Sequence, residues 1–105
     1  MVTDPSQALA LAKLVKERVI QGGIPIQRAL LFGSFARHTH HKDSDIDVAL
    51  VSDQFTGDRF QDISTLIPIL MSLSSQLEVH PFASKGFTSE NSSVVSEILK
   101  EGIDV

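Results

Sequence analysis

Cysteine is absent from the 105 residues of this chain, and so are tryptophan and tyrosine. Without cysteine the chain has no disulfides, no thiolate nucleophile and no cysteine-ligated zinc or iron–sulfur site. Apolar runs are also short, and none reaches the roughly 18 to 20 residues that a membrane-spanning helix needs. The first residues do not combine a basic segment with an apolar one, as a secretion signal would. The sequence therefore predicts a cytoplasmic protein that does not enter the membrane.

Positive charge is scarce in this chain. Nine lysine and arginine residues stand against thirteen aspartate and glutamate residues, so the formal net charge is −4. Broad, sequence-independent binding of nucleic acid needs a basic surface that neutralises phosphates, and this composition argues against one. Binding of a single nucleotide is not excluded, because a metal ion can neutralise its phosphates.

The chain is predicted to form one domain over residues 1–105, since about 100 residues support one hydrophobic core but not two. Along the chain, segments with apolar residues at helical spacing alternate with short apolar segments that are typical of buried strands. The predicted helices cover residues 5–21, 58–75 and 92–100, with one helical turn at 34–37, and the predicted strands cover 26–32, 45–51, 77–82 and 103–105. Pro68 should kink its helix or split it in two. The fold class is α/β (α+β), in the order αββαβα, with helices against one small sheet.

Two aspartates stand at the start of the second strand, DIDVALV, which runs from Asp45 to Val51. Side chains alternate across a strand, so Asp45 and Asp47 should point to one face and Ile46 to the other. The two carboxylates stand roughly 6.6 Å apart along the strand, and both can reach one cation. Unpaired carboxylates on a half-buried strand repel each other, and a hard ion such as Mg²⁺ removes that cost. The alternative is a solvated strand end in which Asp45 caps a turn.

A glycine–serine pair follows the preceding strand directly. Gly33 and Ser34 end the apolar stretch IQRALLF and open the predicted helical turn. Backbone N–H groups and a hydroxyl at such a place suit a phosphate group, although a plain strand-ending turn is the alternative for Gly33 alone. Arg37, one helical turn further on, either reaches a phosphate oxygen or pairs with an aspartate of the site. The pair together with the Asp-x-Asp segment favours a site for phosphate and metal.

The segment GSFAR, followed after a loop by SDIDVALV, resembles the nucleotidyltransferase superfamily of DNA polymerase β, and most of all its minimal nucleotidyltransferases from bacteria and archaea. The family pattern is an apolar strand, Gly-Ser, a loop, Asp-apolar-Asp-apolar, and a third carboxylate on a later strand. Glu78 in LEVHPF matches that third carboxylate, and Pro81 places its strand near an edge of the sheet. The resemblance covers residues 26–53 and, through element order and the tail EILKEGIDV, the rest. It implies a small mixed β-sheet flanked by helices, the nucleotidyltransferase core.

This resemblance also implies a reaction, the metal-dependent transfer of an NMP group, AMP from ATP, to a hydroxyl acceptor. Asp45, Asp47 and Glu78 would be the catalytic and metal-binding residues, with two Mg²⁺ ions bridging the triphosphate. Gly33 and Ser34 would contact the outer phosphates, and Glu78 would help to deprotonate the acceptor. Such an arrangement suits in-line attack on the α-phosphate, because two metal ions stabilise both the entering and the leaving oxygen.

The four histidines are harder to assign. The loop residues His38, His40 and His41 match no zinc-binding spacing and are predicted to lie in a solvated loop, with phosphate contact or adventitious metal binding as alternatives. Family members often carry glycine where this chain has His38. His80 follows Glu78 by two positions and is expected on the same strand face, which leaves an active-site role open.

Two functions fit the sequence. Minimal nucleotidyltransferases of this kind commonly pair with a small helical HEPN protein as antitoxin and toxin, and some of these antitoxins transfer AMP to a tyrosine of the toxin. The resemblance therefore implies an enzymatic antitoxin whose acceptor is a partner protein. The alternative is a non-catalytic module that binds a nucleotide or a partner and neutralises a toxin by contact, with a vestigial site. Retention of all three carboxylates favours the enzyme. A homodimer is compatible with the sequence.

Overall fold

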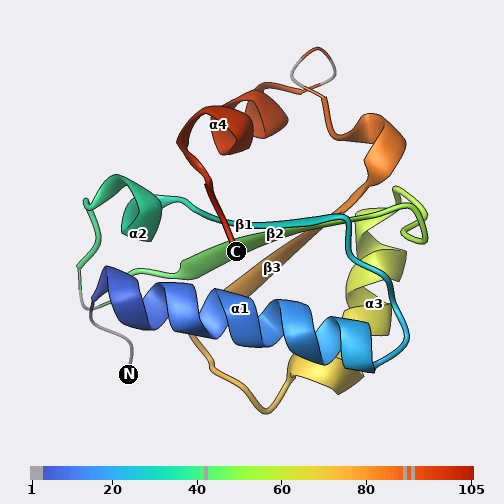
Figure 1. The fold of residues 1–105 in the computed structure, drawn as a ribbon, viewed down its shortest axis with the longest axis horizontal. Helices are drawn as coiled ribbons and strands as arrows, with labels where there is room; N and C mark the ends of the chain where they lie inside the picture. The colour runs from blue at the N-terminus through green and yellow to red at the C-terminus, as the bar shows by residue number, and fades with distance from the viewer. Residues whose placement is uncertain (1–3, 42, 89, 91) are drawn as a thin grey trace.

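The computed structural model of the protein describes residues 4–41, 43–88, 90 and 92–105 (Figure 1). Within these residues four helices alternate with four strands: α1 (Pro5–Gln21), β1 (Arg28–Phe32), α2 (Ser34–Arg37), β2 (Ile46–Ser52), α3 (Arg59–Leu70), β3 (Leu77–Ala83), α4 (Ser93–Glu101) and β4 (Ile103–Asp104), with a 3₁₀ turn at Ser84–Gly86 between β3 and α4. The predicted architecture of helices and strands is confirmed, and apart from the end of the third helix every predicted boundary lies within two residues of the observed one.

The ends of the helices follow from capping and from proline. The Asp4 side chain caps α1 by accepting a hydrogen bond from the backbone N–H of Gln7 at 2.9 Å. The third helix is shorter than predicted: α3 is not split at Pro68, and it ends at Leu70 and not at residue 75. Pro68 stands in the last turn, where its missing N–H removes one hydrogen bond. No helix in the described ranges is long and apolar enough to cross a bilayer.

The four strands form one mixed sheet in the order β3-β2-β1-β4. Strand β2 runs antiparallel to β1 and parallel to β3, and β4 pairs antiparallel with β1. Strand β3 therefore lies at an edge of this sheet, as Pro81 predicts, because a residue without an N–H weakens a ladder inside a sheet. The inner position of β2 gives residues 47–51 a register partner on both β1 and β3.

The helices cover the two faces of the sheet unequally. Helices α1 and α3 pack on one face, whose buried strand residues are Ala29, Leu31, Ile46, Val48 and Leu50. Helix α4 covers part of the other face, and Figure 1 shows it across the strands from α1. Strand alternation places Asp47 and Glu78 on the α4 face. Asp47 is half-buried and Glu78 is exposed, so this end of the face stays accessible.

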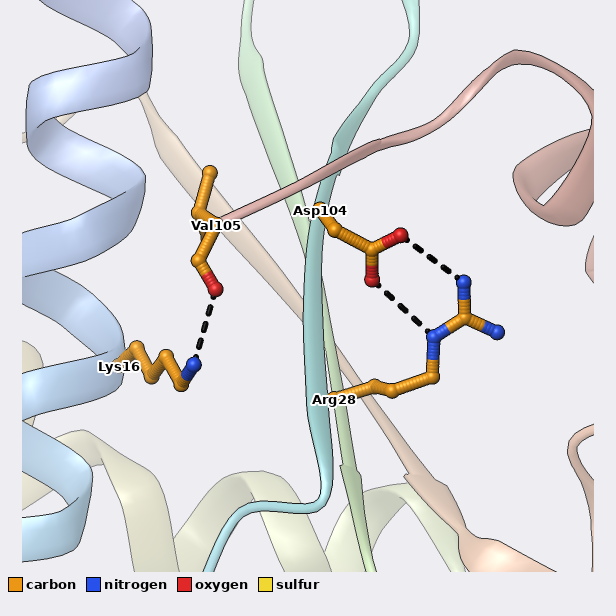
Figure 2. A network of polar contacts seen from close by, with 4 residues as sticks. All are labelled: Lys16, Arg28, Asp104 and Val105. Carbon is orange, nitrogen blue, oxygen red and sulfur yellow. Dashed lines mark hydrogen bonds and ion pairs between the residues drawn. The ribbon is translucent and has the colours of Figure 1, made fainter.

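Polar contacts hold the last strand in place (Figure 2). Arg28 donates from Nε and Nη2 to the two carboxylate oxygens of Asp104, each at 3.1 Å. Lys16 Nζ on α1 donates to the backbone carbonyl of Val105 at 2.9 Å. The hydrogen bonds from Arg28 hold the pKa of Asp104 below its ordinary value, against a smaller opposing effect of desolvation. The chain beyond α4 is thus tied to both β1 and α1.

Candidate active site

Asp47 lies at the centre of the site because its strand is paired on both sides. The antiparallel register places it opposite Phe32, and the parallel register places it opposite Glu78. The chain leaves β1 after Phe32, so Gly33 comes to lie beside the Asp47 carboxylate. Residues that are far apart in the sequence are therefore brought together by strand register.

Gly33 fixes one side of the Asp47 carboxylate. Its backbone has φ 78° and ψ −155°, a region that is essentially restricted to glycine. A Cβ at this position would overlap Asp47 Oδ2 and lie 3.2 Å from Asp47 Cγ. The absence of a side chain thus lets the carboxylate pack against the backbone. A side chain at position 33 would therefore displace the Asp47 carboxylate, a constraint that the sequence did not indicate.

The other oxygen of Asp47 contacts His80. Asp47 Oδ1 and His80 Nε2 lie 3.1 Å apart, and only 21% and 18% of the two side chains are exposed. Asp47, Glu78 and His80 each offer a ligand atom, and these atoms lie within 4.8 Å of one another. No other three histidine or acidic residues in the described part of the chain bring such atoms equally close. Two carboxylates at this distance fit a hard divalent cation.

Asp45 lies at the end of the loop and not in the strand. Strand β2 begins at Ile46, one residue later than predicted, and Asp45 is exposed. It lines an open hollow of about 490 Å³ together with Gly33, Ser34 and Asp47. Among the described residues, Asp45 is not part of the close cluster of ligand atoms around Asp47. Asp45 and Asp47 thus line the same hollow, Asp45 from the loop and Asp47 from strand β2.

Arg37 lines the same hollow but pairs elsewhere. Its Nη1 lies 3.2 Å from Oε2 of Glu101 on α4, and pairing with an aspartate of the site, one of the two alternatives, is not seen in the described residues. The Arg37 side chain is 45% exposed and that of Glu101 35% exposed, so this ion pair is worth little. Arg37 can therefore leave Glu101 for a stronger anion at small cost.

The loop histidines occupy three different settings. His38 has φ 60° and ψ 30°, the left-handed conformation that ends α2. Glycine adopts this conformation most readily and histidine better than most residues, so the loop geometry does not require the glycine common in relatives. His40 stacks on Phe35 with ring centroids 4.4 Å apart, which differs from the solvated position predicted for it. His41 is exposed and lines the hollow.

Comparison with known proteins agrees with this geometry. The chain matches the family model of the nucleotidyltransferase domain over residues 11–105. It belongs to the nucleotidyltransferase family. The predicted resemblance is confirmed, and nucleotidyl transfer is the class of enzyme activity that follows from membership.

Two solved structures share the fold of this nucleotidyltransferase. A provisionally assigned nucleotidyltransferase from Sulfolobus solfataricus superposes with a TM-score of 0.63 at 16% identity, over 99% of this chain and 87% of the other. A toxin–antitoxin structure with AMP-PNP gives a TM-score of 0.51 at 23% identity, over 85% and 70% of the two chains. At such identities the likeness establishes the fold alone. We found no match among curated proteins.

A second hollow of the nucleotidyltransferase lies between α3 and the edge strand β3. This groove has a volume of about 350 Å³. Its apolar lining consists of Ile63, Leu66, Ile67, Leu70, Met71, Leu77 and Val79. Arg59 and Glu78 line it as well, so Glu78 belongs to both the groove and the acidic cluster. The groove therefore meets the acidic cluster at Glu78.

Sequence reasoning gave too little weight to His80 and missed Arg59. Arg59, the first residue of α3, contacts His80 on β3, with 3.4 Å between Arg59 Nη1 and His80 Nδ1. The spacing of two between Glu78 and His80 was a usable signal for their shared face. Arg59 gives no such signal, because its contact depends on how the start of α3 packs beside β3.

Proposed function

We propose that this nucleotidyltransferase transfers AMP from ATP to a hydroxyl group of a partner protein. The observation that carries the proposal is the convergence of the Asp47 and Glu78 carboxylates, with Asp47 also beside Gly33 and lining a hollow large enough for phosphates. Such a site combines negative charge, which a cation would neutralise, with open space that a triphosphate would occupy.

Mg²⁺ is the cation that we expect, held by Asp47 and Glu78, with Asp45 taking part in binding a second ion. The donor set is compatible with this choice, because carboxylate oxygens suit hard ions that keep part of their water shell. When bound, Mg²⁺ neutralises phosphate charge and makes pyrophosphate a better leaving group.

The remaining residues of the hollow are suited to the triphosphate. The Ser34 hydroxyl, the backbone N–H groups at Gly33 and Ser34, and the guanidinium of Arg37 would hold its outer phosphates. The acceptor oxygen then forms a bond to the α-phosphorus, and the bond from that phosphorus to the bridging oxygen breaks, so that pyrophosphate leaves. Glu78 would take the proton of the attacking hydroxyl. Binding and reaction are thus divided between the two sides of Asp47, toward the end of β1 and toward β3.

The apolar groove favours a protein as the acceptor. Two residues that line it, Ile67 and Met71, are 53% and 77% exposed, and Phe60 at the start of α3 is 84% exposed. Apolar residues gathered in this way are typical of protein-binding surfaces and unlike a surface for a sugar or a nucleic acid. Glu78 at the groove would face a hydroxyl that a docked segment presents. A cytoplasmic toxin of the small helical HEPN type is the partner that we propose, and the fold shared with a toxin–antitoxin structure supports it.

The test uses ATP labelled at the α-phosphate, Mg²⁺ and the protein encoded by the neighbouring gene. We expect label on that protein with the wild type and none with Asp47→Asn or Glu78→Gln, both of which should still bind the partner. Asp53→Asn is the matched control, because Asp53 is an exposed carboxylate just after β2 and outside the site. If the wild type transfers no label and Asp47→Asn neutralises the partner equally well, the protein acts by contact alone.

A further inference from the structure

His80 connects Arg59 to Asp47 through its two ring nitrogens. Nδ1 lies 3.4 Å from Arg59 Nη1, and Nε2 lies 3.1 Å from Asp47 Oδ1. The edge-on contact with the Phe32 ring, with centroids 5.0 Å apart, holds the plane of the imidazole. The ring is therefore restrained by three neighbours from three different elements.

These neighbours determine which ring nitrogen carries the proton. A guanidinium has donors and no acceptor, so Nδ1 must accept from Arg59. An ionised carboxylate only accepts, so Nε2 must carry the proton that it donates to Asp47. The other neutral tautomer would set two donors against each other at Arg59 and two acceptors against each other at Asp47. Both contacts are satisfied when Nε2 donates to Asp47 and Nδ1 accepts from Arg59.

This protonation argues against His80 as a metal ligand, although its distance from Asp47 and Glu78 would allow it. A histidine that binds a metal through one nitrogen normally donates from the other to a carboxylate, a carbonyl or water. In this chain the other nitrogen faces a donor, Arg59, and Nε2 has no free lone pair. Distance alone would have assigned His80 to the wrong role.

We propose that His80 is a positioning residue that orients Asp47, and that Arg59 sets its tautomer. The Nε2–H group holds Oδ1 of Asp47 while the Gly33 backbone packs against Oδ2, so the carboxylate is fixed from both sides. The ligand set then consists of oxygens only, which favours Mg²⁺ over softer ions. This inference rests on the proposed function in that Asp47 is taken as a metal ligand. It goes further by assigning two residues outside the predicted site.

The tautomer is measured first, in the metal-free protein, by long-range ¹H–¹⁵N NMR of the His80 ring at neutral pH. We expect a protonated Nε2 and an unprotonated Nδ1. In Arg59→Glu the new carboxylate only accepts, so Nδ1 should become protonated, whereas Lys85→Glu makes the same charge change at an exposed residue and should leave the ring as it is. A wild-type ring protonated on Nδ1, or an Arg59→Glu ring without that proton, would overturn the proposal.

The second measurement is Mn²⁺ binding, followed by the EPR signal of the free ion. His80→Gln keeps an amide donor close to the place of Nε2 and should bind within about twofold of the wild type. His80→Leu removes the donor and should weaken binding about 10-fold or more, as for other groups that orient a metal ligand. Electron spin-echo spectra of the bound ion should show no directly coordinated ¹⁴N. Equal binding by His80→Leu, or a coordinated ¹⁴N in the wild type, would refute the positioning role.

These results separate the inference from the proposed function. The NMR signature needs neither metal nor nucleotide, so it holds even if no AMP is transferred. A protein with the expected tautomer that fails to label its partner contradicts the proposed function and leaves the assignment of Arg59 and His80 standing.

Discussion

Replacing Gly33 by alanine tests how the site is built. At φ 78° and ψ −155° an alanine is strained by roughly 1 to 3 kcal/mol, since only glycine occupies this region readily. The added Cβ would also overlap Asp47 Oδ2, so either the carboxylate or the turn must move. We expect Gly33→Ala to lower the free energy of unfolding by about 1 to 3 kcal/mol from strain, and further through the overlap with Asp47. Mn²⁺ affinity should fall as well, because Asp47 loses its orientation.

A matched control separates the strain from the overlap. Gly57 also has a positive φ, 90°, but a Cβ there meets nothing within 4 Å. Gly57→Ala should therefore reduce stability through strain alone and leave Mn²⁺ binding unchanged. In an Asp47→Ala background the overlap with the carboxylate is absent, so the penalty of Gly33→Ala should shrink.

Urea denaturation followed by circular dichroism gives the free energies of unfolding, and Mn²⁺ titration gives the affinities. The difference between the Gly33→Ala penalties in the two backgrounds measures its contact with Asp47. An identical penalty in both, together with wild-type Mn²⁺ binding by Gly33→Ala, would show that Gly33 does not position Asp47.

Three further perturbations probe the hollow, the loop and the last strand. Glu101→Gln should free Arg37 and tighten binding of ATP a few-fold in calorimetry, with stability changed by less than about 1 kcal/mol; weaker binding would mean that the ion pair orients Arg37 productively. His38→Gly should raise the free energy of unfolding by up to about 1 kcal/mol in urea, since glycine is unstrained in the left-handed conformation, and a loss would contradict that. The pKa of Asp104 is lowered in the folded state, so its contribution is complete above the ordinary pKa of roughly 3.9 and is lost as the pH falls below it. The stability advantage of the wild type over Asp104→Asn should therefore shrink between about pH 5 and pH 2, and a constant advantage would rule out the pairing with Arg28 as its source.

The parts of the fold that the sequence predicted are those that short-range patterns control. The Asp4 cap, the strand that ends at Gly33 and the alternation around Asp47 all depend on neighbours within a few residues. Asp62 shows the limit of such patterns, because helical periodicity marks it only as polar. In the structure it is buried and accepts hydrogen bonds from Thr56 and from the Gly57 backbone.

The residues of the candidate site likewise fall into those that local sequence patterns predict and those that they do not. Glu78 and His80 could be placed on one face from their spacing alone. The contact of His80 with Arg59 could not be predicted, because it depends on how the start of α3 packs beside the edge strand. Likewise, nothing local shows that Arg37 pairs with Glu101, which lies on a helix 64 positions further along the chain. Register and helix packing decide these contacts, and both are properties of the whole sheet.

The most direct test of the central claim follows both ends of the triphosphate. The nucleotidyltransferase, its genetic neighbour and Mg²⁺ are incubated with ATP that carries different phosphorus isotopes at the α and γ positions. Nucleotidyl transfer predicts the α label on the partner protein and an equal amount of the γ label in pyrophosphate, with neither product formed by Asp47→Asn. The γ label on the partner, or a neutralised partner that carries no label, would contradict the account.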